Sequence, residues 1–122
     1  MVKLIFCLRR RSDITEEEFH RYWRDEHGPL VARHAGALGI RRYVQLHTAA
    51  DPVNDVLAAT RQAPEAFDGV AELWFDDVDA LVASAASDDG RTAAAELASD
   101  EQRFIDHVRS PIFVAQEHVV IG

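Results

Sequence analysis

The chain has 122 residues and a mass of 13.6 kDa, which is the size of one domain. Hydrophobic residues make up 48% of it and charged residues 28%, a balance that excludes an intrinsically disordered chain. Because 21 Asp and Glu oppose 13 Lys and Arg, the formal net charge is −8, which argues against nucleic acid and anionic membranes as partners.

The N-terminal part predicts a strand followed by a helix. Residues 3–9 form a short run rich in Leu, Ile and Phe that gives way to charge, which is typical of a buried strand. Thr15 and Glu18 then have the spacing of a capping box, and Ile14 and Phe19 can close a hydrophobic staple around it. These signals predict that a helix begins at Thr15.

One face of this helix is apolar. Phe19, Tyr22, Trp23 and His27 follow one another at positions i, i+3, i+4 and i+8, so they share a face that we expect to meet the sheet. The Gly-Pro pair at 28–29 predicts that the helix breaks just after His27 and that a new short helix begins there.

The rest of the chain predicts three strands and a second helix. Alanine-rich amphipathic sequence over 78–86 and about 91–108 predicts a helix that is broken near 88–90, with Asp76 as its N-cap. The long connection 48–67 contains a weakly helical stretch at 53–60. The strands are expected at 40–47, 69–75 and 112–121.

This order of elements predicts a single α+β domain over residues 1–122. A strand, helix, strand, strand, helix, strand order is that of the ferredoxin-like βαββαβ fold, in which an antiparallel four-stranded sheet carries two helices, here both broken, on one face. The opposite face would leave apolar side chains in water. Pairing two such sheets in a homodimer is the simplest way to cover it.

The cysteine content and the hydropathy of the sequence indicate where in the cell the protein is expected. Cys7 is the only cysteine, and it lies in an apolar run where a buried free thiol is expected. No segment approaches the roughly 18 apolar residues of a membrane span. We therefore expect a cytoplasmic protein without a membrane partner.

His27 is the leading catalytic candidate. It lies on the apolar helix face beside Trp23, where a partly buried imidazole could act as general acid or base near neutral pH. A core histidine bonded to a backbone carbonyl, or a helix C-cap, is the alternative.

Further side chains are candidates for the same site. Tyr43 and His118 lie in predicted strands and could polarise a carbonyl or a phenol, although an exposed strand position is the alternative for His118. Aromatic residues at such spacing are often plain core. The candidates for binding a small apolar or aromatic molecule are Tyr22, Trp23, His47, Glu72, Trp74, Asp100 and Phe104.

The sequence predicts neither a metal nor a cofactor. His20, His27 and His34 are each seven residues apart, so neighbours lie roughly 10 Å apart along a helix, too far to share one ion. A Gly-rich phosphate loop, a CxxC pair and a Ser/His/Asp context are all missing from the sequence.

Several parts of the sequence form a recognisable set, namely FHRYW at 19–23, HGPLV at 27–31, GIRRY at 39–43, FDGVAELWFD at 67–76, and Asp100 with Phe104. Together they resemble the EthD family, and the resemblance covers nearly the whole chain except 48–66. It implies a dimeric α/β barrel, in which two ferredoxin-like sheets pack face to face and each subunit keeps a pocket between sheet and helices. It also implies that His27 matches a family hallmark, followed by Tyr22, Trp23 and Tyr43.

The resemblance leaves several functions open. Its members and structural relatives include a protein of ether-degradation gene clusters, polyketide cyclases, decarboxylases, dehydratases, isomerases and cofactor-independent monooxygenases. The leading hypothesis is a cofactor-independent enzyme that acts on an aromatic or polyketide-like apolar substrate by general acid–base chemistry. The alternatives are a monooxygenase-like oxidoreductase, an accessory protein of a degradation pathway, a non-catalytic binding protein and a haem-handling barrel.

Overall fold

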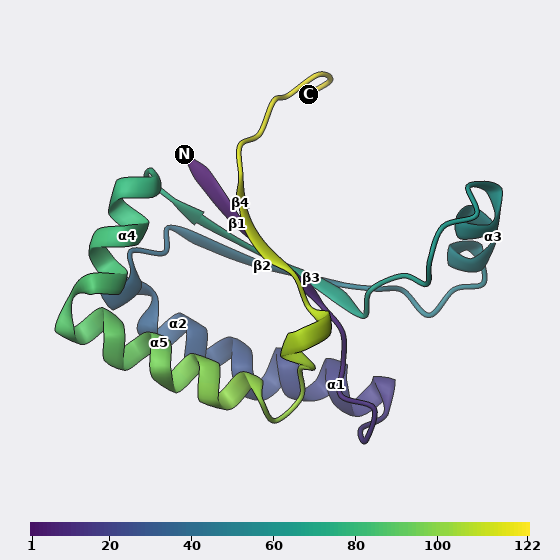
Figure 1. The fold of residues 1–122 in the computed structure, drawn as a ribbon, viewed down its shortest axis with the longest axis horizontal. Coiled ribbons are helices and arrows are strands. Elements are labelled where there is room, and N and C mark those ends of the chain that lie inside the picture. The colour runs from purple at the N-terminus through teal and green to yellow at the C-terminus, as the bar shows by residue number, and fades with distance from the viewer.

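The computed structural model describes all residues 1–122, and it has one four-stranded sheet with helices packed on one of its faces (Figure 1). No helix is long and apolar enough to cross a bilayer. The elements are β1 (Val2–Leu8), α1 (Glu16–Tyr22), the π-helical turn η1 (Trp23–His27), α2 (Gly28–Leu38), β2 (Arg42–His47), α3 (Val53–Thr60), β3 (Gly69–Phe75), α4 (Val78–Ala86), α5 (Asp88–Glu101), the short 3₁₀ helix η2 (His107–Arg109) and β4 (Ile112–Ala115).

The sheet confirms the predicted ferredoxin-like topology. Its strands lie in the order β2-β3-β1-β4, and every neighbouring pair is antiparallel. Residues that pair directly point to the same face. The row of Gln45, Ala71, Phe6 and Ile112 and the row of Tyr43, Leu73, Leu4 and Val114 therefore share one face, which is the face covered by the helices.

The other face of the sheet is left open by the helices, as Figure 1 shows. Its apolar side chains are Ile5, Val44, Leu46, Val70, Trp74 and Phe113, and we call this set the open sheet face.

The start of α1 follows the prediction in part. The Oγ1 atom of Thr15 accepts a hydrogen bond of 3.1 Å from the backbone N–H of Glu18, a cap that typically contributes about 1 kcal/mol. The carboxylate of Glu18 does not return to the cap residue. It accepts two hydrogen bonds from Arg21 instead, so only half of the capping box forms.

The predicted helix break after His27 is wrong. Gly28 keeps helical dihedral angles and its N–H reaches the carbonyl of Trp23, five residues back, so α1, η1 and α2 form one continuous helix. Pro29 lacks an N–H and its ring would crowd the carbonyl four residues earlier. The wider π-helical turn removes that conflict, and such turns are frequent at functional sites.

The second helix breaks close to where the sequence predicts. Ser87 has extended dihedral angles, and its hydroxyl accepts a hydrogen bond from the N–H of Gly90 to begin α5. The N-cap of α4 is Asp77, and Asp76 forms an ion pair with Arg41. The helix ends at Glu101, seven residues before the predicted end at 108.

The last strand is shorter than predicted, whereas the helix in the long connection is confirmed. The last strand ends at Ala115, and residues 116–122 are exposed and outside any helix or strand, where a strand to 121 was expected. The weakly helical stretch is confirmed as α3, which Figure 1 shows standing away from the body of the fold.

The core lies between the sheet and the continuous helix. Trp23, Phe19, Phe104 and Leu8 are its largest fully buried side chains. A Cβ atom at Gly69 would overlap the ring of Trp23, so the glycine at the start of β3 allows the indole to lie directly against the strand.

Candidate active site

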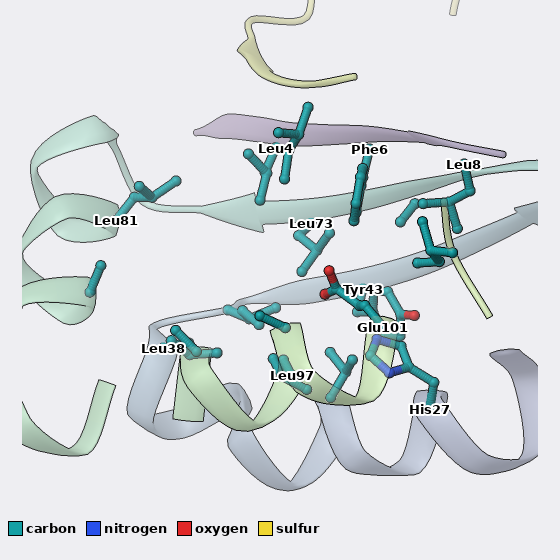
Figure 2. Close-up of a pocket in the computed structure, with 18 of the residues that line it drawn as sticks. Leu4, Phe6, Leu8, His27, Leu38, Tyr43, Leu73, Leu81, Leu97 and Glu101 are labelled. Atoms are coloured by element: carbon teal, nitrogen blue, oxygen red, sulfur yellow. The ribbon is translucent and has the colours of Figure 1, made fainter. Parts of the chain in front are cut away.

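A cavity of about 250 Å³ lies between the sheet and the helices. Twenty residues line it and eighteen are hydrophobic, and the two exceptions are His27 and Glu101. Figure 2 shows these two side chains on the helices at one end of the cavity, with Tyr43 and Leu73 entering from the sheet. Polar chemistry within the cavity therefore depends on very few atoms.

His27 is fixed by a carboxylate from a different helix. Its Nδ1 atom lies 2.8 Å from Oδ2 of Asp100, and the residue is 4% exposed. Since a carboxylate only accepts, Nδ1 carries the hydrogen and Nε2 is the acceptor nitrogen of the neutral ring. Nε2 has no hydrogen-bond partner in the protein and His27 lines the cavity, so this nitrogen is available to a ligand.

The other carboxylate oxygen of Asp100 has two further partners. The hydroxyl of Tyr22 donates a hydrogen bond of 2.5 Å to Oδ1, and the guanidinium of Arg103 lies 3.6 Å from the same oxygen. Burial, together with this hydrogen bond, raises the pKa of Tyr22 to about 12, so the phenol keeps its proton at neutral pH. Asp100 lies in the last turn of α5, beside the cavity-lining Glu101.

Glu101 is a site residue that sequence reasoning missed. Its side chain lines the cavity, and Oε1 lies 2.9 Å from Nε2 of His107. Burial raises the pKa of Glu101, and the hydrogen bond from His107 and the nearby His27 oppose that shift. A signal was present, because Glu101 continues the stripe of Ala94, Leu97 and Ala98 at helical spacing, and all three line the cavity.

Tyr43 contributes a neutral phenol to the cavity. Its hydroxyl oxygen accepts a hydrogen bond of 2.8 Å from Nε2 of Gln45, which also donates to the carbonyl of Trp23. Burial raises the pKa of Tyr43, so its O–H remains a donor at neutral pH.

The structure brings only some of the other predicted residues to the cavity. Trp23 lines it, and Phe104 packs against His27 at a ring separation of 5.1 Å without lining it. The ring of His47 lies 4.4 Å from that of Trp23 and its Nδ1 is bonded to His20, outside the cavity.

Three predicted residues lie elsewhere. Glu72 and Trp74 are on the open sheet face, where Glu72 pairs with Lys3 at 3.5 Å, and Lys3 and Arg42 lie over the Trp74 ring. Successive residues of a strand point to opposite faces of the sheet, and Glu72 and Trp74 in β3 point away from the helices. His118 is exposed in the segment after β4, because the strand ends earlier than expected.

The side chains form no cluster of three or more His, Cys, Asp or Glu residues that could hold a metal ion.

Comparison with known proteins places this geometry in a family. The EthD domain model matches residues 11–108, whereas no curated protein matches the chain. An EthD family protein from Bacillus halodurans has a TM-score of 0.64 at 19% identity, with 97% of this chain and 99% of that chain covered.

Two other solved structures share the fold. A dimeric protein of unknown function with a ferredoxin-like fold, from Bacteroides fragilis, has a TM-score of 0.60 at 14% identity, with 95% of both chains covered. SnoaB, a cofactor-independent oxygenase from Streptomyces nogalater, has a TM-score of 0.57 at 14% identity, with 98% of this chain and 95% of that chain covered. Since the family model spans most of the chain and its solved relatives share the sheet and helices that enclose the cavity, the protein belongs to the EthD family.

Proposed function

We propose that this protein is a cofactor-independent enzyme that binds a small apolar or aromatic molecule in the cavity and moves a proton with Nε2 of His27. The observation that carries the proposal is the 2.8 Å hydrogen bond between His27 and Asp100 at the edge of an otherwise apolar cavity. A buried base held in one tautomer by a carboxylate is the arrangement that general base catalysis needs.

The roles of the residues follow from the contacts. Asp100 keeps the hydrogen on Nδ1 and stabilises the imidazolium that forms when Nε2 accepts a proton. The hydroxyl of Tyr22 donates a hydrogen bond to the other carboxylate oxygen of Asp100, and this bond limits rotation of the Asp100 side chain. The apolar lining offers few polar groups that could compete for the reacting atoms.

Proton removal is common to several reaction types. Cyclisation, dehydration, decarboxylation and isomerisation of an apolar carbonyl compound can all begin in this way, and a positioned base contributes typically about 10² to 10⁴ in rate. A second candidate is oxygenation, because a deprotonated phenol or enol can reduce oxygen, and SnoaB of the same fold is described as a cofactor-independent oxygenase.

Exchange of a probe's carbon-bound hydrogen with D₂O tests the proposal. We choose 2-tetralone, an apolar two-ring ketone, and follow its α-hydrogens by NMR. Wild type should accelerate exchange over buffer, and His27→Gln should remove the acceleration while the quenching of Trp23 fluorescence by the probe persists. His34→Gln is the matched control, because His34 pairs with Glu96 outside the cavity and should leave exchange unchanged. Equal acceleration by wild type and His27→Gln would contradict the role of His27, and a wild-type rate equal to that of buffer would indicate a binding protein.

We also propose that the functional unit is a homodimer formed through the open sheet face. Leu46 and Phe113 on this face are 47% and 49% exposed, which is costly for a large apolar surface in water. Lys3, Arg42 and Glu72 on the same face offer both signs of charge to a second copy. The relative from Bacteroides fragilis is described as dimeric, which supports a dimer.

We place the protein in the cytoplasm. Cys7 is a free thiol, and burial raises its pKa, which disfavours the reactive thiolate. A single unpaired thiol suits a reducing compartment.

A further inference from the structure

We propose that Glu101 is the proton donor of this site and acts opposite His27 on an apolar substrate of one or two rings that carries a single enolisable carbonyl group. This inference rests on the function proposed above and names the second acid–base residue and the class of substrate.

The placement of the two polar side chains is the first argument. His27 comes from η1 and Glu101 from the last turn of α5, and they are the only non-hydrophobic residues among the twenty that line the cavity. Both lie at the same end of it, as Figure 2 shows. A ligand that fills the apolar part therefore presents its polar end to both groups at once.

The protonation of Glu101 is the second argument. A carboxylate among hydrocarbon side chains loses hydration, so the neutral acid is favoured and the pKa of Glu101 is raised. The ionisable groups that face it are His27, His107, Asp100 and Tyr43. His107 holds Oε1 in place at 2.9 Å, so the other oxygen can carry the proton toward the ligand.

The size and lining of the cavity define the substrate. A cavity of about 150 Å³ lined by apolar side chains holds one benzene ring. A volume of about 250 Å³ therefore has room for about two fused rings. A second polar group that lies away from His27, Glu101 and the Tyr43 hydroxyl would face hydrocarbon and lose its hydrogen bonds to water, which disfavours substrates with several oxygens.

The proposed step moves two protons and needs no oxidant. Nε2 of His27 takes a proton from the carbon next to the carbonyl, and the electron pair of the broken C–H bond forms a C=C bond. The π electrons of the carbonyl move to its oxygen, which takes the proton of Glu101, so an enol forms and Glu101 becomes a carboxylate. Where the substrate has a further C=C bond conjugated with the enol, return of a proton from the imidazolium to the far carbon of that bond gives a double-bond isomer, with the enol proton returning to Glu101.

Exchange of the α-hydrogens of 2-tetralone in D₂O tests the role of Glu101 separately from that of His27. Glu101→Gln keeps the shape and can donate a hydrogen bond but cannot release a proton. We expect its exchange rate to fall about 10²-fold, with probe affinity within about twofold of wild type. Glu96→Gln is the matched control, since Glu96 lies on the same helix with its side chain 53% exposed.

The outcomes separate this inference from the proposed function. If Glu101→Gln exchanges as fast as wild type while His27→Gln loses exchange, Glu101 is not the donor and the proposed function stands. If wild type does not exceed buffer, both fail. Glu101→Met provides a second variant, because it keeps the side-chain length without donating or accepting. Its preference for 2-tetralone over tetralin, the same two rings without the oxygen, should be smaller than that of wild type, and an unchanged preference for the ketone would overturn the inference.

Discussion

The Nδ1 atom of His27 lies 2.8 Å from Oδ2 of Asp100, so a turn of one helix is joined to the last turn of another at the edge of the cavity. Replacing Asp100 by Asn can place an amide N–H against Nδ1, which favours the tautomer with hydrogen on Nε2. We expect Asp100→Asn to slow exchange of 2-tetralone by about 10² to 10⁴ while tryptophan quenching by the probe persists. NMR exchange and fluorescence titration measure the two effects.

Tyr22→Phe is the control for this prediction. It removes the other hydrogen bond to the same carboxylate and leaves the contact to His27 intact. Its free energy of unfolding should fall by about 1 kcal/mol, and exchange should fall less than about tenfold. Full exchange activity in Asp100→Asn would contradict the role given to this carboxylate.

The cavity itself can be narrowed without touching its polar groups. Ala98 lines it from α5, and Ala98→Leu places three more carbon atoms inside. We expect affinity for 2-tetralone to fall about tenfold or more, since the added volume competes with the second ring. Ala95→Leu on the exposed side of the same helix is the control. Unchanged affinity in Ala98→Leu would show that the probe binds elsewhere.

The fold could be predicted because local signals agreed with one another. The spacing of Phe19, Tyr22, Trp23 and His27 defines a buried helix face, and all four are in or against the core. The helix break was wrong because a Gly-Pro pair usually ends a helix, whereas a π-helical turn here accommodates Pro29.

The candidate site could be predicted only in part. His27 was identified because it lies on a periodic apolar helix face, and Tyr43 because it lies in a predicted strand and in a segment that resembles the EthD family. Glu72 and Trp74 were misplaced because alternation along a strand separates two faces without saying which one meets the helices. Pairing of Asp100 with His27 joins residues 73 positions apart, and no local pattern encodes such a contact.

The dimer can be tested on the open sheet face. Phe113→Glu places a charge among apolar side chains, where an unpaired carboxylate is costly in a buried interface. We expect light scattering at micromolar concentration to give twice 13.6 kDa for wild type and 13.6 kDa for the variant. Val82→Glu on α4 is a matched change at a residue that is 56% exposed, and it should remain dimeric. A monomeric wild type would remove the dimer proposal.

The raised pKa of Glu101 has a consequence for stability. In the unfolded chain this carboxyl ionises near pH 4.5, whereas in the folded protein it keeps its proton to higher pH because it is buried. The contribution of Glu101 to the free energy of unfolding is therefore fully present below about pH 4.5, and it is lost as pH rises through the pKa of the folded state. Glu101→Gln removes this loss. The free energy of unfolding of Glu101→Gln minus that of wild type should therefore increase between pH 4 and pH 7. Urea titrations of both proteins measure this difference. A constant difference over that range would contradict the buried acid.

A second pH effect arises where His20 and His47 meet outside the cavity. Their Nδ1 atoms lie 2.7 Å apart, so one ring donates and the other accepts, and the contact is lost when both are charged. Desolvation lowers the pKa of both rings, although Asp68 and Glu16 oppose the shift at His20, and Arg24 adds to it at both. The unfolded chain therefore takes up protons first, and folding weakens as pH falls through about 6.5. His20→Gln should show a shallower fall in the free energy of unfolding between pH 7.5 and pH 5.5, whereas His34→Gln should follow wild type. An unchanged slope in His20→Gln would mean that the pair does not control this transition.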